Sequence, residues 1–310
     1  MAPHGLRVGA LVSRNACRPG SSQLAKAPLT HRQRSTASHE SNQKAATASL
    51  SPRWLGEIKQ RIGKCITFGL DPSQTARAGH ILQEIARDWR ELVAGSEGFL
   101  TTADRRGMHR QAVVWGEMDS MGRCISDVPA GAEIFFLPKG HVNNVMYNRY
   151  AESGRIGWAQ KLAMLDPANK KAWRELFAPT SAGLILRAIT TEFKFPMKWP
   201  DNISVYHKLR AEPTAGTDSF ILDVLIVSEL HQRPAARCIE DIVVYDYTIG
   251  KKTALRPFML DVFKDTWQLQ EEAKRKNSAR VYGLLDRVRQ LEQESWDRKD
   301  AVEDMGADKR

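Results

Sequence analysis

The feature that most constrains the fold is a change of sequence period near residue 183. Residues 141–163, HVNNVMYNRYAESGRIGWAQKLA, contain no proline and no strand-like alternation, which predicts a long helix. Four β-branched, partly alternating runs follow, separated by turn signals: GLILRAITTEFKFPMKW, NISVYHKL, SFILDVLIVSEL and ARCIEDIVVYDYTI. HRQAVVWGEM (109–118) predicts one strand before the helix. This order indicates an α+β fold, with a four-stranded antiparallel meander and the helix against one face.

Small residues recur along the predicted long helix at Ala151, Gly154 and Gly157. Glycine inside a helix costs about 1 kcal/mol relative to alanine. Two glycines therefore indicate a need for close packing, and we expect this helix to lie close against another surface.

Helical spacing also flanks the α+β region. Before it, apolar residues recur at helical intervals and end near Gly95 and Gly98: Ile81, Leu82, Ile85, Trp89, Leu92 and Val93. After it, a second stripe comprises Val281, Leu284, Leu285, Val288 and Leu291. The polar KRKNS run at 274–278 predicts a break between two C-terminal helices.

The net charge of +10 is concentrated in the first 53 residues, which hold eight Lys or Arg and one acid, Glu40. The rest of the chain has 38 basic and 35 acidic residues, or +3. A body so nearly balanced carries no electrostatic footprint for nucleic acid. No apolar run is long enough to predict a transmembrane helix.

The arm at 1–53 is rich in Arg, Ser, Ala and Thr and almost free of acids, which is typical of a mitochondrial transit peptide. A generic disordered tail is the alternative. The four cysteines are scattered and form no C-x-x-C pair, so neither a disulfide framework nor a zinc site is indicated. We divide the remainder into a helical N-terminal extension (54–108), an α+β domain (109–260) and a C-terminal helical extension (261–310).

The segment HVNNVMYNRYAESGRI resembles the start of the central helix in hotdog-fold thioesterases of the 4-hydroxybenzoyl-CoA thioesterase type, particularly thioesterase-like proteins from fungi. In that family a strand runs into a D-x-x-G-H-V-N-N turn before the helix. FKFPMKWPDNISVY and VVYDYTIGKKTALRP resemble the family's later strands. The resemblance implies an antiparallel sheet wrapped around a long central helix, here with extra N- and C-terminal helices.

This sequence departs from the family pattern at the catalytic aspartate. Leu137 stands four residues before His141, where the family has its acid. Deleting residues 123–140 would join VVWGEMDSMG to HVNNVMYN and place Asp119 four residues before His141. Two explanations fit: the 18 residues are a retained intron, in frame and of a length suited to filamentous fungi, or they are a true insertion at the turn. We favour the intron.

The resemblance implies that Asp119 is the general base or nucleophile and that His141 polarises the substrate or orients the acid. A turn or helix-capping role is the alternative for Asp119, and a structural hydrogen bond for His141. The turn at Val142, Asn143 and Asn144 is expected to hold the thioester carbonyl at a helix N-terminus, with both asparagines capping the helix. Tyr147 is expected to face the pocket or the core. Glu152, Arg149 and Arg155 are interpreted as ion-pair residues.

The function implied is hydrolysis of acyl-CoA or acyl-carrier-protein thioesters by a homodimer or homotetramer, with no metal or organic cofactor. A catalytically inactive hotdog module that binds acyl groups or a protein partner is the alternative. A hotdog dehydratase is disfavoured because the His-Val-Asn-Asn sequence is thioesterase-like. If residues 123–140 are present in the mature protein, we expect weak or no activity, since small displacements of catalytic groups are costly.

Overall fold

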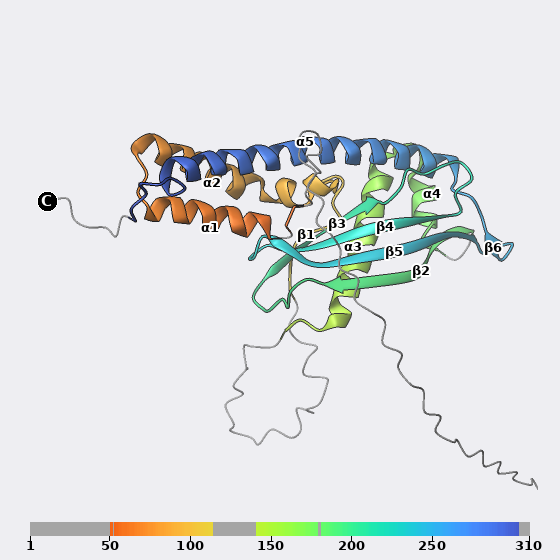
Figure 1. The fold of residues 1–310 in the computed structure, drawn as a ribbon. Helices are drawn as coiled ribbons and strands as arrows, with labels where there is room; N and C mark the ends of the chain where they lie inside the picture. Colours follow the sequence, from red (N-terminus) through yellow and green to blue (C-terminus); the bar gives the residue numbers. More distant parts are fainter. Residues whose placement is uncertain (1–49, 52, 114–140, 179–180, 304–310) are drawn as a thin grey trace, which may run out of the picture. The chain divides into compact units, whose positions relative to one another are not determined.

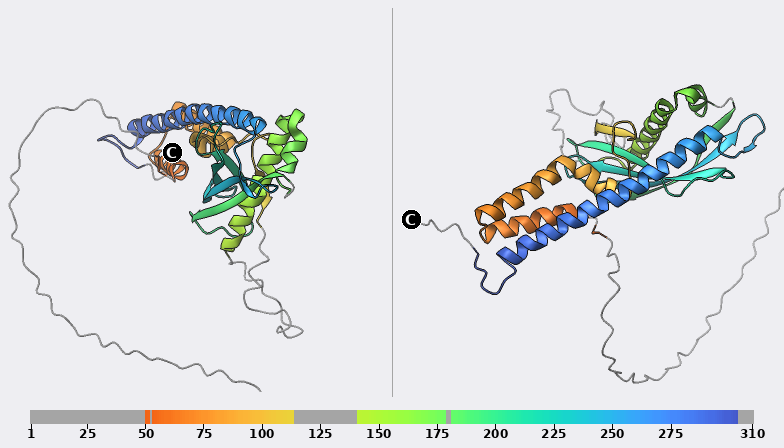
Figure 2. Two further views of the ribbon diagram at one scale, coloured as in Figure 1. Left: turned by 90° about the vertical axis from the view of Figure 1, so that its right-hand side faces the viewer. Right: turned by 90° about the horizontal axis from the view of Figure 1, so that it is seen from above.

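The fold is an antiparallel sheet that curls around one long helix, with further helices on its other face (Figures 1 and 2). The computed structural model describes residues 50–51, 53–113, 141–178 and 181–303, all within one compact unit, Ser49–Arg310. The strands are β1 (Met108–Ala112), β2 (Ala182–Phe193), β3 (Asn202–Leu209), β4 (Ser219–Ser228), β5 (Arg233–Asp246) and β6 (Lys251–Lys252). Residues 1–49 of the 1–53 arm, Asp119 and the 123–140 segment lie outside the described residues.

Strand order corrects the predicted four-stranded meander. The order is β1-β3-β4-β5-β2, with the short β6 also pairing β5. Of the four strands predicted to form the meander, only β3, β4 and β5 pair with their neighbours in sequence. Strand β2 instead pairs along its whole length with β5, from Ala182 opposite Asp246 to Phe193 opposite Ala236. The alternation of a strand shows which face is buried but not which neighbour it joins. Here the 12-residue β2 finds a partner of matching length in the 14-residue β5.

Helix α3 (Asn144–Leu165) lies in the curl of the sheet. Its inward side shares two apolar clusters with the strands: Tyr147, Tyr150 and Ala151 pack with β3–β5 near its start, and Trp158, Leu162 and Ala163 do so near its end. A one-turn helix, η4 (Pro167–Asn169), and α4 (Lys170–Glu175) follow and pack beside the end of α3.

The two glycines of α3 sit where the helix approaches its neighbours most closely, as the sequence predicted. A Cβ on Gly154 would lie 2.7 Å from Val205 Cγ1 and 2.8 Å from His207 Cε1. A Cβ on Gly157 would lie 2.6 Å from the backbone oxygen of Gly107. Any larger side chain would force the helix away from the sheet.

A buried ion pair joins α3 to the sheet. Arg155 on α3 pairs with Glu240 on β5, whose side chain is fully buried. Burial raises the pKa of Glu240, and the adjacent Arg155 guanidinium opposes that rise. Arg155 thus makes the internal ion pair expected of it, and removing one partner would leave an uncompensated buried charge.

A three-helix bundle packs on the other face of the sheet, against β3 and β4. It comprises α1 (Trp54–Thr67), α2 (Pro72–Val93) and the C-terminal half of α5 (Pro257–Ser295), with the short η1 (Gly95–Glu97) after α2. Their apolar faces form one cluster with Tyr206, Leu225 and Val227 of β3 and β4. Asp71 begins α2 with a capping box to Gln74, so the backbone N–H of each residue is bonded by the other's side chain.

Helix α5 is continuous, so the predicted break at KRKNS is wrong. Lys274, Arg275 and Lys276 of that run are exposed, whereas Asn277 and Ser278 face η1. Ser278 Oγ donates to the Ser96 backbone oxygen at 2.9 Å, and Asn277 Nδ2 donates to the Ala273 carbonyl within α5. Asn277 is buried where α5 crosses η1. The polar run interrupts the apolar stripe of α5 where this helix changes its packing partner, from the sheet domain to the bundle.

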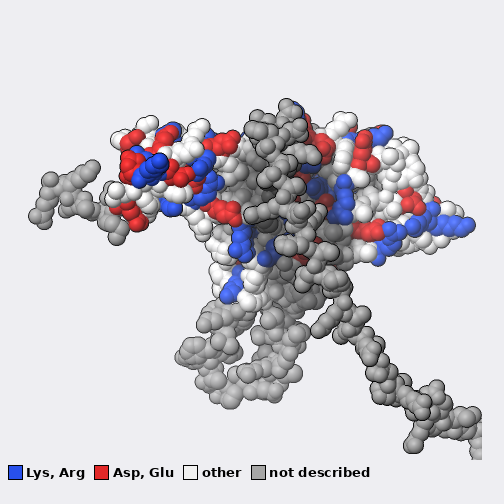
Figure 3. Space-filling view, in the orientation of Figure 1, with Lys and Arg blue, Asp and Glu red and all other residues white. Residues whose placement is uncertain are grey.

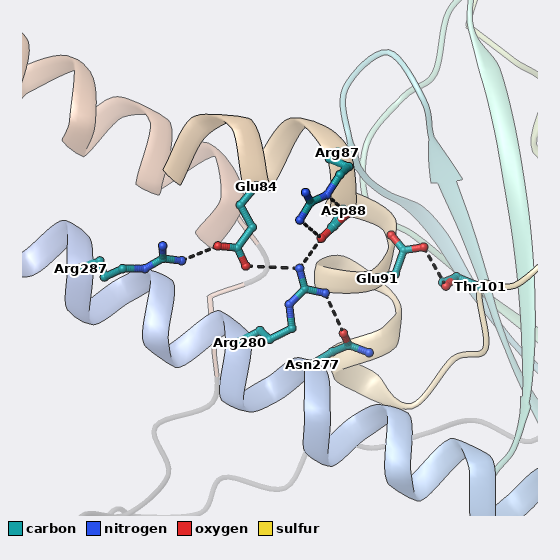
Figure 4. A network of polar contacts seen from close by, with 8 residues as sticks. All are labelled: Glu84, Arg87, Asp88, Glu91, Thr101, Asn277, Arg280 and Arg287. Atoms are coloured by element: carbon teal, nitrogen blue, oxygen red, sulfur yellow. Dashed lines mark hydrogen bonds and ion pairs between the residues drawn. The ribbon is translucent and has the colours of Figure 1, made fainter. Parts of the chain in front are cut away.

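Ion pairs fasten α2 to α5 (Figure 4). Arg280 pairs with Glu84 and Asp88, and Arg287 pairs with Glu84. Burial raises the pKa of Glu84, but the hydrogen bonds and charges of Arg287 and Arg280 outweigh it and leave that pKa below its ordinary value. Basic and acidic side chains interleave over this end of the molecule (Figure 3). No helix in the described part of the chain is long and apolar enough to cross a membrane.

Gly157→Ala should lower the free energy of unfolding by roughly 1–3 kcal/mol, because the new methyl group would overlap the Gly107 backbone. Gly283→Ala in α5 is the matched control: nothing lies within 4 Å of its Cβ position, so the change should stabilise by about 0.5–1 kcal/mol. Urea unfolding of both variants measures the difference. Equal effects would show that α3 does not need close approach at this point.

His207 on β3 is a buried imidazole beneath α3, stacked on Trp158. Burial, helped by the positive charge of Arg155, lowers its pKa to about 3. The unfolded chain, with an ordinary pKa near 6.5, therefore binds a proton that the folded chain does not, between those two values. Stability from this group is complete above about pH 6.5 and declines as pH falls towards 3.

The unfolding free energy should fall between about pH 6.5 and pH 5, with His207 contributing up to about 1.4 kcal/mol per pH unit. His207→Leu removes the titrating group and should make this slope shallower. Urea unfolding at several pH values in this window gives both slopes. Parallel slopes for the two proteins would contradict a neutral buried imidazole.

Candidate active site

The candidate active site lies at the N-terminus of α3. Asn143 is the N-cap: its side-chain oxygen accepts a hydrogen bond from the Val145 N–H at 3.1 Å, and its carbonyl accepts one from the Met146 N–H at 3.0 Å. Asparagine is among the favoured N-cap residues because its short side chain satisfies a free helix N–H. The cap fixes where the helix begins.

The link between β2 and β3 forms the wall beside this helix start. The Val142 N–H donates to the Met197 carbonyl at 3.0 Å, and His141 forms a β-bridge with Lys198. The Met197 N–H donates to the Tyr147 hydroxyl at 3.3 Å. The first residues of α3 are thus held to residues 197–198 by backbone and side-chain bonds.

Asp201 anchors the other end of this link. Its carboxylate accepts hydrogen bonds from Ser228 Oγ at 2.5 Å and from the Leu230 N–H at 3.1 Å. Its backbone carbonyl accepts from the Val113 N–H at 2.9 Å, just beyond β1. One buried aspartate therefore joins the end of β1, the start of β3 and the β4–β5 turn.

A pocket of about 380 Å³ opens at this junction. Its lining comes from the helix start and from the end of β2 with the link that follows: His141, Val142, Asn144, Tyr147, Phe193, Lys194, Phe195 and Pro196. The Tyr147 and Phe193 rings meet edge to face, with centroids 5.1 Å apart. The volume falls within the range of about 300–1,000 Å³ usual for small-molecule sites.

The electrostatics of the pocket favour a partial negative charge. The backbone N–H groups of Asn143 and Asn144 form no hydrogen bond with any described residue. Free N–H groups and the helix dipole together give this end a partial positive charge. Burial raises the pKa of Tyr147, so its hydroxyl stays protonated at neutral pH. These groups can hold a carbonyl oxygen that gains negative charge.

The structure brings most of the sequence-predicted site residues together. His141, Val142, Asn144 and Tyr147 line the pocket, with His141 exposed and Tyr147 almost fully buried. Asn143 caps the helix beside them. Asp119 lies outside the described residues, so its distance from the pocket stays a prediction. Within the described part of the chain, no cluster of three or more His, Cys, Asp or Glu side chains could hold a metal ion.

Sequence reasoning missed the opposite wall of the pocket, residues 193–196. The sequence pattern assigns the FKFP run, which follows a β-branched strand, only to the predicted meander. Two aromatic residues around a lysine, at the point where a strand must end at proline, were the available signal. The wall comes from the β2–β3 link, which is distant from the helix in sequence.

Comparison with known protein families gives one match. Residues 113–263, just under half of the 310-residue chain, match the family model of the thioesterase-like superfamily. These residues are similar to that superfamily, and the predicted α+β hotdog class is confirmed. No curated protein sequence matches the chain.

Solved structures of low identity resemble part of the chain. A Thermus thermophilus thioesterase, solved with coenzyme A and zinc, is 18% identical over 42% of this chain and 84% of its own, with a TM-score of 0.33. A probable thioesterase of Escherichia coli is 20% identical over 41% of this chain and 86% of its own, with a TM-score of 0.33. A Synechocystis 1,4-dihydroxy-2-naphthoyl-CoA thioesterase is 16% identical over 46% of this chain and 90% of its own, with a TM-score of 0.34.

Proposed function

We propose that this protein hydrolyses acyl thioesters at the N-terminus of α3. The observation that carries the proposal is the pocket beside the backbone N–H groups of Asn143 and Asn144, which have no partner among the described residues. The pocket lies in the region that matches the thioesterase-like superfamily. Attack on a thioester carbonyl places negative charge on its oxygen. Donors already aimed at that oxygen stabilise the transition state.

Asp119 is the proposed base or nucleophile. As a base, its carboxylate takes a proton from water, whose oxygen attacks the acyl carbon; the carbon–sulfur bond then breaks, and the thiolate leaves and is protonated. The support is in the sequence: joining Gly122 to His141 restores the spacing of the 4-hydroxybenzoyl-CoA thioesterase type. The proposed substrates are acyl-CoA or acyl-carrier-protein thioesters, and the proposed assembly is a homodimer or homotetramer.

Asp119→Asn should lower kcat/KM for acyl-CoA substrates at least about 100-fold in the protein lacking residues 123–140, because the general base is lost. Asp286→Asn, an exposed acid on α5, is the matched control and should leave activity unchanged. Release of free thiol from an acyl-CoA panel measures both. The full-length chain should be less active than the shortened one, since the insertion separates Asp119 from His141 along the chain.

The possible outcomes of this experiment separate the alternatives. Absence of turnover by both forms would favour the inactive module that binds acyl groups or a partner. Turnover that survives Asp119→Asn would support a hydrolase and reject Asp119 as its base. Intact-mass analysis of the native protein tests the intron, because a mature protein that contains residues 123–140 contradicts it.

We also propose a mitochondrial location, supported by the Arg-rich, acid-poor composition of residues 1–53. A fluorescent protein fused after residue 53 should enter mitochondria. Replacing the arginines of the arm by glutamine should abolish import, because such segments depend on positive charge. Equal cytosolic fluorescence from both fusions would instead support a simple disordered tail.

A further inference from the structure

A second hollow lies between α3 and α4, away from the candidate active site. It measures about 400 Å³ and is lined by Ile156, Ala159, Gln160, Ala163, Met164, Lys170, Trp173, Arg174 and Phe177. At about 1.5 Å per residue, Gln160 lies roughly 20 Å along the helix from Tyr147. The hollow is therefore separate from the pocket at the helix start.

The floor of the hollow is apolar and fixed in place. Ala159 and Ala163 are small and buried, and they leave space that a larger side chain would fill. Trp173 is almost fully buried, and its indole N–H donates to Asp166 Oδ2 at 3.0 Å. Its ring also meets Phe258 edge to face, with centroids 5.2 Å apart. A rigid floor loses little entropy when a ligand binds.

The walls are large apolar side chains left in contact with water. Ile156 is 39% exposed, Met164 66% and Phe177 46%. They flank the floor on both sides, from α3 and from the end of α4. An apolar body that lies along the floor would remove all three from water, at roughly 25 cal/mol per Å² covered.

The rim is basic, and its charges are not neutralised. The side chains of Lys170 and Arg174 are exposed, and neither makes a hydrogen bond or ion pair with a described residue. Their neighbour Lys171 does pair, with Glu175 at 3.8 Å. The nearby Asp166 carboxylate is already occupied by Trp173 and Asn169. The two cations are therefore free to bind an anion.

This combination points to a ligand with a slender apolar body and an anionic end. A peptide would need partners for its backbone N–H and C=O groups, and Gln160 is the one uncharged polar side chain of the lining. A second copy docked by the same face would bring two sets of Lys170 and Arg174 together without acidic partners. Charge complementarity thus favours a small anionic amphiphile over both.

We propose that the α3–α4 hollow binds a fatty acid, with the chain on Ala159, Ala163 and Trp173 and the carboxylate on Lys170 and Arg174. The site is independent of the proposed thioester hydrolysis, since it shares no residue with the candidate active site. Binding and hydrolysis are measured separately, so failure of one is distinct from failure of the other.

Isothermal titration calorimetry with dodecanoate, below its micelle concentration and with the full chain, tests the site. Dodecanoate should bind one per chain, and more tightly than dodecan-1-ol or dodecyltrimethylammonium. The double change Lys170→Gln with Arg174→Gln should weaken binding at least about tenfold, because charge-assisted bonds to the carboxylate are lost. Lys171→Gln, next in sequence but outside the lining, should leave it unchanged.

A second matched pair tests the apolar wall. Met164→Glu places a carboxylate in the wall and should weaken dodecanoate binding at least about tenfold. Leu165→Glu makes the same change one residue on, at a side chain that is also exposed but does not line the hollow. Unchanged melting temperatures show that all four proteins fold.

Other results would overturn the proposal. Equal binding of the cationic and anionic probes would remove the role of Lys170 and Arg174. Equal effects of each variant and its control would place dodecanoate elsewhere. Binding to phosphatidylglycerol vesicles without binding to dodecanoate would indicate a membrane surface. Self-association in sedimentation velocity that Met164→Glu abolishes, again without dodecanoate binding, would indicate a second copy.

Discussion

The close approach of α3 to the sheet is the constraint on which the rest of the structure depends. Gly107, Gly154 and Gly157 have no Cβ at the three points where backbone meets backbone or a β3 side chain. This contact fixes the depth of the helix in the curl of the sheet. With the depth fixed, the helix start meets the 194–201 link and the helix end meets α4, so both hollows are consequences of one packing distance.

The three-helix bundle packs on the same sheet as α3, on the opposite face. Tyr206 shows this on β3: its side chain packs into the bundle cluster, while its neighbours Val205 and His207 face α3. Alternation along a single strand therefore joins two cores. Helix α5 bridges them, since its first turns pack beside Trp158 and Trp173 and its last turns pack on α1 and α2.

The sequence predicted what local pattern controls and missed what distant contacts decide. The long helix, its glycines and its Asn143 cap follow from neighbours within a few residues, and all are present. The place of β2 beside β5 depends on residues about fifty positions away, which periodicity does not encode. The same holds for Phe193 and Phe195 in the pocket. Continuity of α5 was missed because burial of Asn277 against η1 is a tertiary contact that a polar run does not reveal.

The anchoring of the chain around residues 114–140 bears on the interrupted motif. The Val113 N–H bonds the Asp201 carbonyl and the Val142 N–H bonds the Met197 carbonyl, so both flanks are fastened within one five-residue stretch. The two accepting residues, Met197 and Asp201, are at most about 14 Å apart, because four residues separate them along the chain. Without residues 123–140, nine residues would remain to join the flanks, and they can reach about 30 Å. The fold therefore accommodates the chain with or without the insertion. What the 18 residues change is the separation of Asp119 from His141 along the chain, which is 22 residues with them and four residues without them.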